Sequence, residues 1–441
     1  MKINKDRWEK RKNNLYFSTR SKTSINLLKN NKGTHKIELV EIMEFELSEE
    51  HKMVQKSIRE YVAKEVVPNA REWDLNHELP YDKIKKDFAN LGVLGICFPE
   101  KYGGAGMDYI SLAIACAELE YGESSLRVIM SVHTGLNSCG LYQWGTEEQK
   151  KKYLVPQAKG EKFATYGLTE PFAGSDVSGI RSAAVKKGDT WVVNGQKMWI
   201  SLATVADNFL IFAYTDRSKG ASRGMSCFII EKDFPGVTTS DIENKLGVRS
   251  GSTGEIVLKN VEVPAVNMLG EEGEGFKIAM SCLDNGRYTV AAGAVGLTKA
   301  ALDVSVKYAH ERETFGQEIG RHQLIQQKIA KMVSDYESSR LLVYRAGVLK
   351  NKGIRNTKET ALAKWVATNA ALDAANEAIQ VHGSYGFSAD YPVERMWRNA
   401  RGAVIYEGTN EIQTIIQGEY ALGYRKDKPL RKKMPSYTPS D

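Results

Sequence analysis

Hydrophobic residues follow a helical spacing in the first and last thirds of the chain. Between residues 47 and 159 they recur three to four positions apart, as at Val54, Ile58 and Val62. Between residues 275 and 423 the same spacing continues through longer segments, such as "QLIQQKIAKMVSDYESSRLLVYRAGVLK". An apolar stripe with this period is typical of an amphipathic helix. Both parts are therefore predicted to be α-helical.

The middle of the chain has a different pattern. Between residues 166 and 269, short β-branched and aromatic runs such as "FLIFAYT" and "CFIIEK" are separated by turn residues, which predicts strands. The Asn194-Gly195 pair lies between two such runs and predicts a hairpin turn. Strands do not alternate with helices, so a nucleotide-binding α/β order is excluded.

The predicted fold class is therefore α+β, with several domains. We expect an N-terminal α-helical domain, a middle antiparallel β domain and a C-terminal four-helix bundle, at residues 44–160, 161–272 and 273–425. A basic leader, residues 1–43, and a basic tail, residues 426–441, flank these domains.

Charge is concentrated in the leader. The chain of 441 residues has a net charge of +7, and residues 1–42 contain 11 Lys and Arg against 4 Asp and Glu. The rest of the chain is therefore neutral, which argues against a groove for nucleic acid. The composition of the leader indicates a disordered or targeting segment. The alternative is that synthesis of the protein begins at Met43. The protein is expected in the cytoplasm of a prokaryote, or in the mitochondrial matrix if the leader is a presequence. The polar tail is expected to be an irregular or mobile arm.

Several kinds of site are absent from the sequence. The five cysteines are isolated, and there is neither a C-x-x-C nor an H-E-x-x-H pattern, so we expect reduced thiols and no metal site. No run of 18 apolar residues occurs, so no membrane span is predicted.

The segment "IYEGTNEIQ", residues 405–413, combines a carboxylate with a helix start. Thr409 or Asn410 could cap a helix through "EIQTIIQGEYAL", and Glu407 would then only favour its positive end. Alternatively, Glu407 is a catalytic group held on the loop before that helix. These nine residues alone leave both interpretations open.

Two other segments could contact a ligand. In "YGLTEPFAGSD", residues 166–176, Gly174 allows close approach to the backbone and Ser175 can donate to an anionic oxygen; a polar turn is the alternative. In "KMWIS", residues 197–201, Trp199 is either a core residue or the wall of a cofactor site.

Five motifs occur in order along this helix, strand, helix layout: "YGLTEPFAGSD", "KMWIS", "RETFGQEIGRHQ", "QVHGSYG" and "IYEGTNEIQ". Together they resemble the acyl-CoA dehydrogenase family of flavoenzymes, and the resemblance extends from about Phe45 to Gly423. It implies bound FAD, an acyl-CoA substrate, electron-transfer flavoprotein as the electron acceptor and a homo-oligomer, expected to be a tetramer.

The resemblance also implies which residues contact FAD. Within one subunit these are Tyr166, Leu168, Thr169, Gly174, Ser175, Trp199 and Ser201. A second group would reach the cofactor of a neighbouring subunit: Arg312, Thr314, Phe315, Gln323, Gln380, Gly383 and Ser384. Thr409 and Glu411 match flavin-side positions after the loop that contains Glu407.

The resemblance implies that Glu407 is the catalytic base. It would remove the α proton of a thioester while the β hydrogen leaves as hydride to the flavin, and its backbone N–H would contribute to the oxyanion site. Some relatives place the base immediately before the arginine that matches Arg287; here that position is Gly286, which cannot serve. Arg287, Tyr406, Gly408 and Ser175 are implied substrate contacts.

The acyl group is less well defined by the sequence. Arg127 and Ser131 resemble residues of glutaryl-CoA dehydrogenases that bind the distal carboxylate, and Arg127 could instead pair with Glu120 or Glu123. "VIMSVHTGLNS" is closer to short-chain acyl-CoA dehydrogenases. We expect a short-chain acyl-CoA, with glutaryl-CoA as the alternative. An acyl-CoA oxidase and a nucleic-acid-binding flavoprotein homologue are minor alternatives.

Overall fold

The computed structural model describes residues 23–29, 35–41 and 46–438. By its internal contacts the chain divides into two units, residues 1–50 and 51–441. In the first unit, β1 (Thr23–Lys29) and β2 (His35–Glu41) pair antiparallel. The leader thus contains a pair of antiparallel strands, and its role as a targeting segment stays a prediction. The remaining leader residues lie outside the described part.

Helices dominate residues 46–159, as predicted. Helix α5 is apolar on all sides and almost fully buried, as expected of a core helix. Asp108 caps its start, because the Asp108 side chain accepts a hydrogen bond from the backbone N–H of Ser111 at 2.8 Å. The helices are α2 (Glu49–Tyr61), η1 (Val62–Val66), α3 (Ala70–Asn76), α4 (Tyr81–Asn90), η2 (Glu100–Tyr102), α5 (Tyr109–Gly122), α6 (Ser124–Ile129), η3 (Met130–Ser138), α7 (Cys139–Trp144), α8 (Glu147–Gln149), η4 (Lys150–Leu154) and α9 (Val155–Ala158).

The middle of the chain forms one eight-stranded sheet. Seven of its strands follow the order β10-β7-β6-β4-β5-β9-β8, and β3 pairs with β6. The pairings are antiparallel as predicted, except that β3 and β4 both run parallel to β6. Strand β6 is buried along its whole length, which fits its continuous apolar run. The strands are β3 (Ala164–Gly167), β4 (Ala183–Lys187), β5 (Thr190–Ser201), β6 (Asn208–Tyr214), β7 (Met225–Glu231), β8 (Val237–Asp241), β9 (Thr253–Pro264) and β10 (Met268–Leu269).

The predicted hairpin turn at Asn194-Gly195 is wrong. Both residues lie inside β5, where the register with β9 shifts between Val193 and Gly195. The turn into β5 instead contains Gly188, whose φ is +60°. A Cβ atom at Gly195 would lie 2.0 Å from Ser182 Oγ. The glycine therefore permits close approach of a neighbouring segment at a bulge, which is its other common role in strands.

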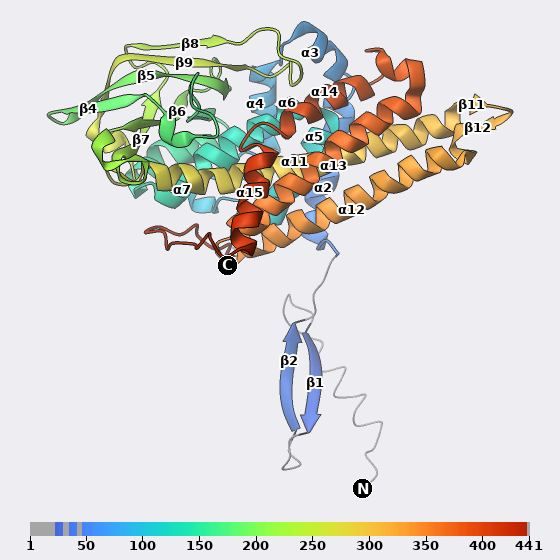
Figure 1. Ribbon diagram of the computed structural model, residues 1–441. Coiled ribbons are helices and arrows are strands. Elements are labelled where there is room, and N and C mark those ends of the chain that lie inside the picture. Colours follow the sequence, from blue (N-terminus) through green and yellow to red (C-terminus); the bar gives the residue numbers. More distant parts are fainter. Residues whose placement is uncertain (1–22, 30–34, 42–45, 439–441) are drawn as a thin grey trace. The chain divides into compact units, whose positions relative to one another are not determined.

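Three long helices form the centre of the C-terminal part: α11 (Gly275–Glu311), α12 (Gln323–Asn351) and α13 (Thr357–His382). They lie side by side, and the small hairpin of β11 (Glu313–Thr314) and β12 (Gln317–Glu318) joins α11 to α12 at the end away from the large sheet (Figure 1). Shorter elements complete this part: η8 (Ile319–Arg321), η9 (Gly383–Phe387), α14 (Val393–Ala403) and α15 (Asn410–Ala421).

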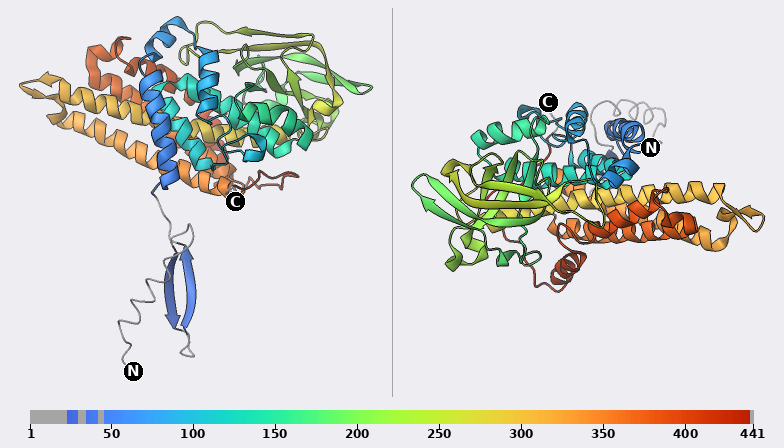
Figure 2. Two further views of the ribbon diagram at one scale, coloured as in Figure 1. Left: turned by 180° about the vertical axis from the view of Figure 1, so that it is seen from behind. Right: turned by 90° about the horizontal axis from the view of Figure 1, so that it is seen from above.

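Helix α11 is the core of the second unit. The N-terminal helices lie on one side of it and the later C-terminal helices on the other (Figure 2). It has the length and hydropathy of a membrane span, yet 78% of its most apolar window is buried inside the protein. Glycine allows close packing here, because a Cβ at Gly296 would lie 1.9 Å from the carbonyl oxygen of Ala117 on α5.

The tail is bonded to the protein body. Residues 426–438 contain no helix or strand, but Arg431 donates to the Glu274 carboxylate at 2.9 and 2.6 Å. The backbone N–H of Tyr437 donates to the carbonyl of Asn351 at 2.9 Å. The described part of the tail is therefore irregular but held in place, which differs from a mobile arm.

Candidate active site

Glu407 stands on a short loop between α14 and α15. Thr409 caps α15, because its Oγ accepts a hydrogen bond from the N–H of Ile412 at 3.4 Å; the capping prediction is confirmed for this residue. Glu407 and Gly408 both have left-handed backbone, with φ of +54° and +91°. This conformation is uncommon for a residue with a side chain and often marks a functional site.

The Glu407 carboxyl is directed into the protein. Its Oε2 atom is inaccessible to water and has no hydrogen-bond partner among the described residues. A Cβ atom at Gly286, on α11, would lie 2.1 Å from this oxygen. The two positions at which the sequence analysis considered a base therefore face the same point, and at Gly286 there is no side chain.

Burial raises the pKa of Glu407 to about 7, although the charges of Arg127, Lys364 and Arg287 and the hydroxyl of Ser131 oppose the shift. A carboxyl removed from water is harder to ionise, and nearby cations reduce that penalty. Around neutral pH the group is therefore close to the balance between its acid and base forms, as a general base requires.

Arg127 lies in a buried polar cluster beside Glu407. It forms an ion pair with Glu120 and donates to the hydroxyl of Tyr406, both at short distance. It also donates to Ser131 Oγ at 3.1 Å, and that hydroxyl lies 2.8 Å from Thr289 Oγ1. Arg127, Ser131 and Glu120 therefore meet in one cluster. The internal ion pair expected as an alternative is present with Glu120.

Arg287 approaches the loop of Glu407 from α11. Its guanidinium donates to Asp284 at 3.2 Å, while its buried Nε has no partner among the described residues. A Cβ atom at Gly408 would lie 3.3 Å from this Nε and 2.6 Å from the side-chain amide nitrogen of Gln413. Gly408 therefore serves both the left-handed turn and the close approach of Arg287.

The first group of predicted FAD contacts lies along β3, the loop after it and β5. The hydroxyl of Tyr166 donates to the carbonyl of Ala279 on α11 at 3.2 Å. The N–H of Met198 donates to the carbonyl of Thr169 at 2.9 Å, which joins the loop to β5. A buried ion pair between Lys197 and Glu170, at 2.6 Å, holds the same junction. Leu168, Gly174, Ser175 and Ser201 belong to this loop and strand.

Trp199 is not a core residue. It lies at the register shift between Lys197 and Ile200, its φ is +61° and its side chain is 60% exposed. A bulge thus turns a flat apolar ring out of the sheet, where it can contact a planar ligand. Gly174 leaves open space around its Cα, so a ligand could also approach the backbone there. These features fit FAD.

The second group of predicted FAD contacts lies elsewhere. Arg312, Thr314 and Phe315 are at the β11–β12 hairpin, away from the large sheet and from α15 (Figure 1). Phe315 is 96% exposed. Gln323 begins α12, and Gln380, Gly383 and Ser384 lie where α13 ends. One chain does not bring these residues to Glu407, as expected if they serve another subunit.

Two residues near Glu407 were missed by the sequence analysis. Lys364 is buried on α13 and donates to Asn410 at 2.9 Å, and Gln413 donates to the carbonyl of Gly408 at 2.9 Å. A signal for Lys364 exists in the sequence, because it shares a helical face with Ala361 and Thr368. Glu411, by contrast, is exposed in the first turn of α15.

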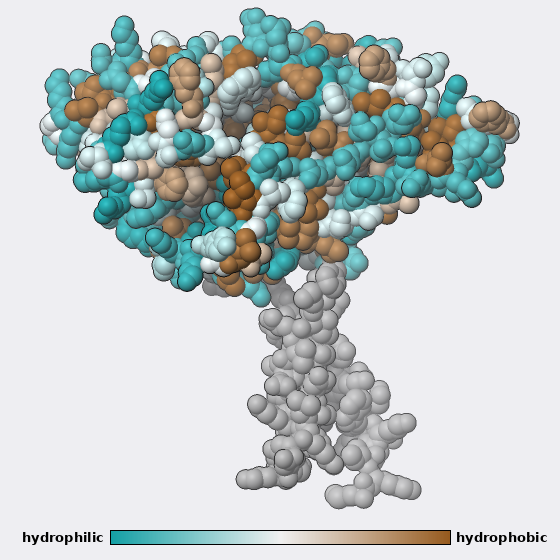
Figure 3. All heavy atoms as spheres, in the orientation of Figure 1, coloured by the Kyte–Doolittle hydropathy of each residue, from teal (hydrophilic) through white to brown (hydrophobic). Residues whose placement is uncertain are grey.

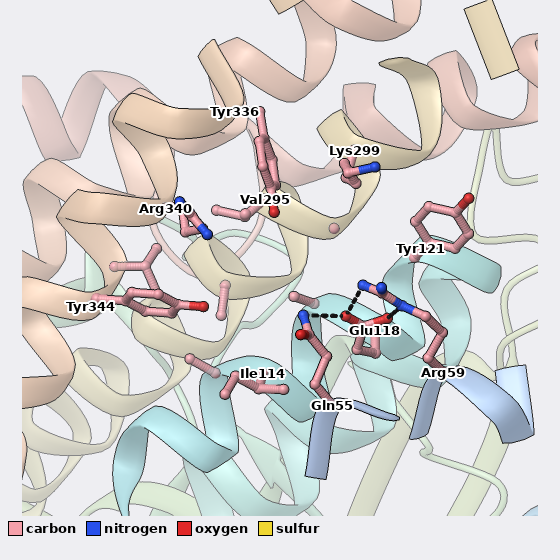
Figure 4. Close-up of a pocket in the computed structure, with 15 residues that line it drawn as sticks. Gln55, Arg59, Ile114, Glu118, Tyr121, Val295, Lys299, Tyr336, Arg340 and Tyr344 are labelled. Atoms are coloured by element: carbon pink, nitrogen blue, oxygen red, sulfur yellow. Dashed lines mark hydrogen bonds and ion pairs between the residues drawn. The ribbon is translucent and has the colours of Figure 1, made fainter. Parts of the chain in front are cut away.

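A separate cleft lies between α2, α5, α11 and α12 (Figure 4). Arg59, Lys299 and Arg340 contribute to its lining, and each forms an ion pair, with Glu118, Asp303 and Glu337 respectively. Its cations are therefore neutralised by the protein itself. Within the described residues, no group of three His, Cys, Asp or Glu side chains could hold a metal ion.

Comparison with known proteins identifies this chain as an oxidoreductase that acts on acyl-CoA. Family models described as the N-terminal, middle and C-terminal domains of acyl-CoA dehydrogenase match residues 48–161, 165–261 and 273–422. The chain belongs to the acyl-CoA dehydrogenase family. Its architecture is the three-domain fold predicted from the sequence.

Two relatives have different substrates in their names. The short-chain-specific acyl-CoA dehydrogenase of Clostridium acetobutylicum is 45% identical over 374 residues, 85% of this chain and 98% of that protein. The glutaryl-CoA dehydrogenase of Desulfococcus multivorans is 42% identical over 388 residues, 87% of this chain and 99% of that protein.

Solved structures support the same family. Butyryl-CoA dehydrogenase from Megasphaera elsdenii has a TM-score of 0.84 at 40% identity, and the match covers 86% of this chain and 100% of that chain. A chain from work on the electron-transferring flavoprotein of Acidaminococcus fermentans has a TM-score of 0.85 at 42% identity, with 86% and 100% covered. An acyl-CoA dehydrogenase from Bacillus anthracis complexed with FAD has a TM-score of 0.80 at 34% identity, with 87% and 68% covered. FAD is the cofactor of this chain.

Proposed function

We propose that this chain catalyses the α,β-dehydrogenation of a short-chain acyl-CoA thioester to the trans-2-enoyl-CoA, with Glu407 as the catalytic base. The observation that carries the proposal is the Glu407 carboxyl, whose Oε2 is buried and has no partner among the described residues. The α C–H of a thioester is a very weak acid, so its removal requires a poorly solvated carboxylate at close range. The similarity to the short-chain enzyme of Clostridium acetobutylicum supports this substrate class.

The reaction divides between a proton and a hydride. The α C–H bond breaks, its proton passes to Glu407 and its electron pair forms the Cα–Cβ double bond. The β hydrogen leaves with its own electron pair, and FAD supplies the acceptor. Thr409 fixes the loop of Glu407 by capping α15. Gly408 lets Arg287 approach the loop closely, and Arg287, with its unpartnered Nε, orients the CoA side of the thioester.

We also propose how the flavin site is completed and reoxidised. Tyr166, Leu168, Thr169, Gly174, Ser175, Trp199 and Ser201 hold FAD within one subunit. The residues around the β11–β12 hairpin contact the FAD of a neighbouring subunit in a homotetramer. Electrons then pass to electron-transfer flavoprotein, which is supported by the similarity to the Acidaminococcus fermentans chain.

Glutaryl-CoA is the second candidate substrate, because Arg127 has one donor to spare. A guanidinium has five N–H groups, and four of those of Arg127 are used by Glu120, Ser131 and Tyr406. Against this candidate, Glu120 already neutralises the arginine. A distal carboxylate would therefore meet a pair without net charge, and buried pairs of this kind are commonly structural.

A comparison of butyryl-CoA with glutaryl-CoA separates the two substrates. Wild-type enzyme is expected to have the higher kcat/KM for butyryl-CoA. The double variant Glu120→Gln/Arg127→Met removes both charges together, which avoids leaving one buried charge unpaired, and should retain butyryl-CoA activity. If the wild type prefers glutaryl-CoA and the double variant loses that activity selectively, Arg127 binds the distal carboxylate.

The reaction class is tested by flavin absorbance under anaerobic conditions. Butyryl-CoA should bleach the oxidised flavin band, and electron-transfer flavoprotein should restore it. Rapid recovery in air without that partner would identify an oxidase, and the absence of bleaching by any acyl-CoA would contradict the proposal.

A further inference from the structure

Lys364 is a buried cation that bonds to Asn410, the residue that begins α15 after the loop of the proposed base. It lies on α13 and is completely inaccessible to solvent. In the described part of the chain, no carboxylate lies within 4.0 Å of its Nζ. The ammonium donates instead to a neutral acceptor, the side-chain oxygen of Asn410, at 2.9 Å. A buried lysine without a counterion is costly to keep charged, so its presence here requires an explanation.

The partner of Lys364 closes the loop that carries Glu407. The side-chain oxygen of Asn410 also accepts from Thr368 at 3.1 Å, and its amide donates to Asn369 at 2.8 Å. The backbone N–H of Asn410 donates to the carbonyl of Val404 at 3.0 Å. Residue 410 thus bonds both to α13 and to the start of the loop that contains Glu407.

The other charges around Glu407 are already paired or exposed. Arg127, from α6, is paired with Glu120 of α5, and Arg287 is paired with Asp284 within α11. On α15, Glu411 is exposed to solvent. Tyr406, next to the base, is uncharged while its hydroxyl is protonated. Of the three cations that lower the pKa of Glu407, Lys364 is therefore the one without a carboxylate partner of its own among the described residues.

We propose that Lys364 is a positioning residue for the base: through Asn410 it holds the loop of Glu407, and its positive charge stabilises the carboxylate form of Glu407. This inference rests on the proposed role of Glu407. The two groups titrate in one range, because burial lowers the pKa of Lys364 to about 7 and raises the pKa of Glu407 to about 7. Each charge favours the other, so their titrations are coupled.

The test is the pH profile of kcat/KM with butyryl-CoA, measured on the FAD-loaded enzyme. Only the carboxylate form of Glu407 accepts a proton, so wild-type activity should fall as pH decreases below about 7. In Lys364→Met the carboxylate loses a cation, and the acidic limb should move up by about one pH unit. Activity near pH 6 would then fall about tenfold relative to wild type. At pH values above the shifted acidic limb, the variant should recover most of this lost activity.

Thr368→Val is the matched control. It removes the other side-chain donor to the same oxygen of Asn410 without changing any charge, so its acidic limb should coincide with that of wild type. Asn410→Asp is a second variant, for use if Lys364→Met fails to fold. It preserves the shape of residue 410 but neutralises Lys364, and should move the limb in the same direction as Lys364→Met.

Two results would overturn the inference. One is an acidic limb that neither Lys364→Met nor Asn410→Asp moves. The other is an equal shift in Thr368→Val, which would reduce Lys364 to a structural role. Both differ from failure of the proposed function, since in that case Glu407→Gln would itself retain bleaching by butyryl-CoA.

Discussion

At the scale of single residues, the proposed chemistry depends on the carboxylate of Glu407 and on the lack of a side chain at Gly286. Glu407 occupies a left-handed backbone position, and its Oε2 lies at the place that a side chain at Gly286 would enter. Because the two positions converge on one point, the base should be transferable from the loop to α11. This expectation follows from the 2.1 Å between a Cβ atom at Gly286 and the Glu407 Oε2 atom. The substrate would be the same for both positions of the base.

The transfer can be measured with the variant Gly286→Glu/Glu407→Gly. Glu407→Gly alone should lose at least about 10³-fold in kcat, within the usual range for removal of a general base. The double variant should recover at least about tenfold of that loss, because its new side chain enters the space left by the Glu407 carboxyl, with Leu136, whose Cδ2 lies 2.6 Å from the new Cβ, moving aside. Gly286→Gln/Glu407→Gly is the control without a carboxylate. Equal activities of the two double variants, both loaded with FAD, would contradict the convergence.

Sequence motifs predicted some of these residues and missed others for a physical reason. Glu407 and Arg127 lie in recognisable local segments, so roles could be proposed for them from the sequence alone. Lys364 is 43 positions before Glu407 and reaches its loop only because α13 packs against α15. Contacts made by distant helices depend on packing, which spacing along one sequence does not reveal.

At the scale of secondary-structure elements, β5 shows how tertiary packing overrides a local turn signal. Asn194-Gly195 has the residues of a hairpin turn, but the chain continues through them as a strand with a bulge. A second register shift turns Trp199 outward. The order of helices and strands was predictable from periodicity, whereas these irregularities depend on neighbours that the pattern does not contain.

Gly195→Ala should therefore destabilise the protein strongly. Its Cβ would lie 2.0 Å from Ser182 Oγ and 2.9 Å from the Cα of the same residue, so the backbone of a packed segment must move. We expect a loss of more than about 2 kcal/mol, seen as a lower melting temperature. Gly418→Ala is the control: this exposed helical position has open space, and alanine should stabilise it slightly. A melting temperature of Gly195→Ala equal to that of wild type would contradict the packing described for β5.

At the scale of the whole molecule, exposed apolar residues indicate a surface for association. Hydrophobic side chains are visible on the face formed by the C-terminal helices (Figure 3). Large exposed apolar residues in this part of the chain include Phe315, Leu324, Phe387, Ile405 and Ile415. Exposed apolar patches of this kind often mark interfaces, and Phe315 belongs to the group expected to contact FAD in another subunit.

Phe315→Glu tests this expectation without altering the base. The variant should lose FAD and shift from the proposed tetramer to smaller species, because a buried unpaired carboxylate at an interface is costly. Sedimentation measures the oligomeric state, and the flavin absorbance reports occupancy. Val266→Glu, at a position 77% exposed in the middle part of the chain, should change neither. Full occupancy and an unchanged assembly in Phe315→Glu would rule out the proposed role.

The most direct measurement of the central claim is an anaerobic titration of FAD-loaded Glu407→Gln with butyryl-CoA, beside wild type. Glutamine keeps the size of the side chain but cannot accept the α proton. We predict that the variant retains FAD and binds butyryl-CoA, yet its flavin band does not bleach, whereas that of wild type does. Bleaching of Glu407→Gln at the rate and extent of wild type would show that Glu407 is not the base.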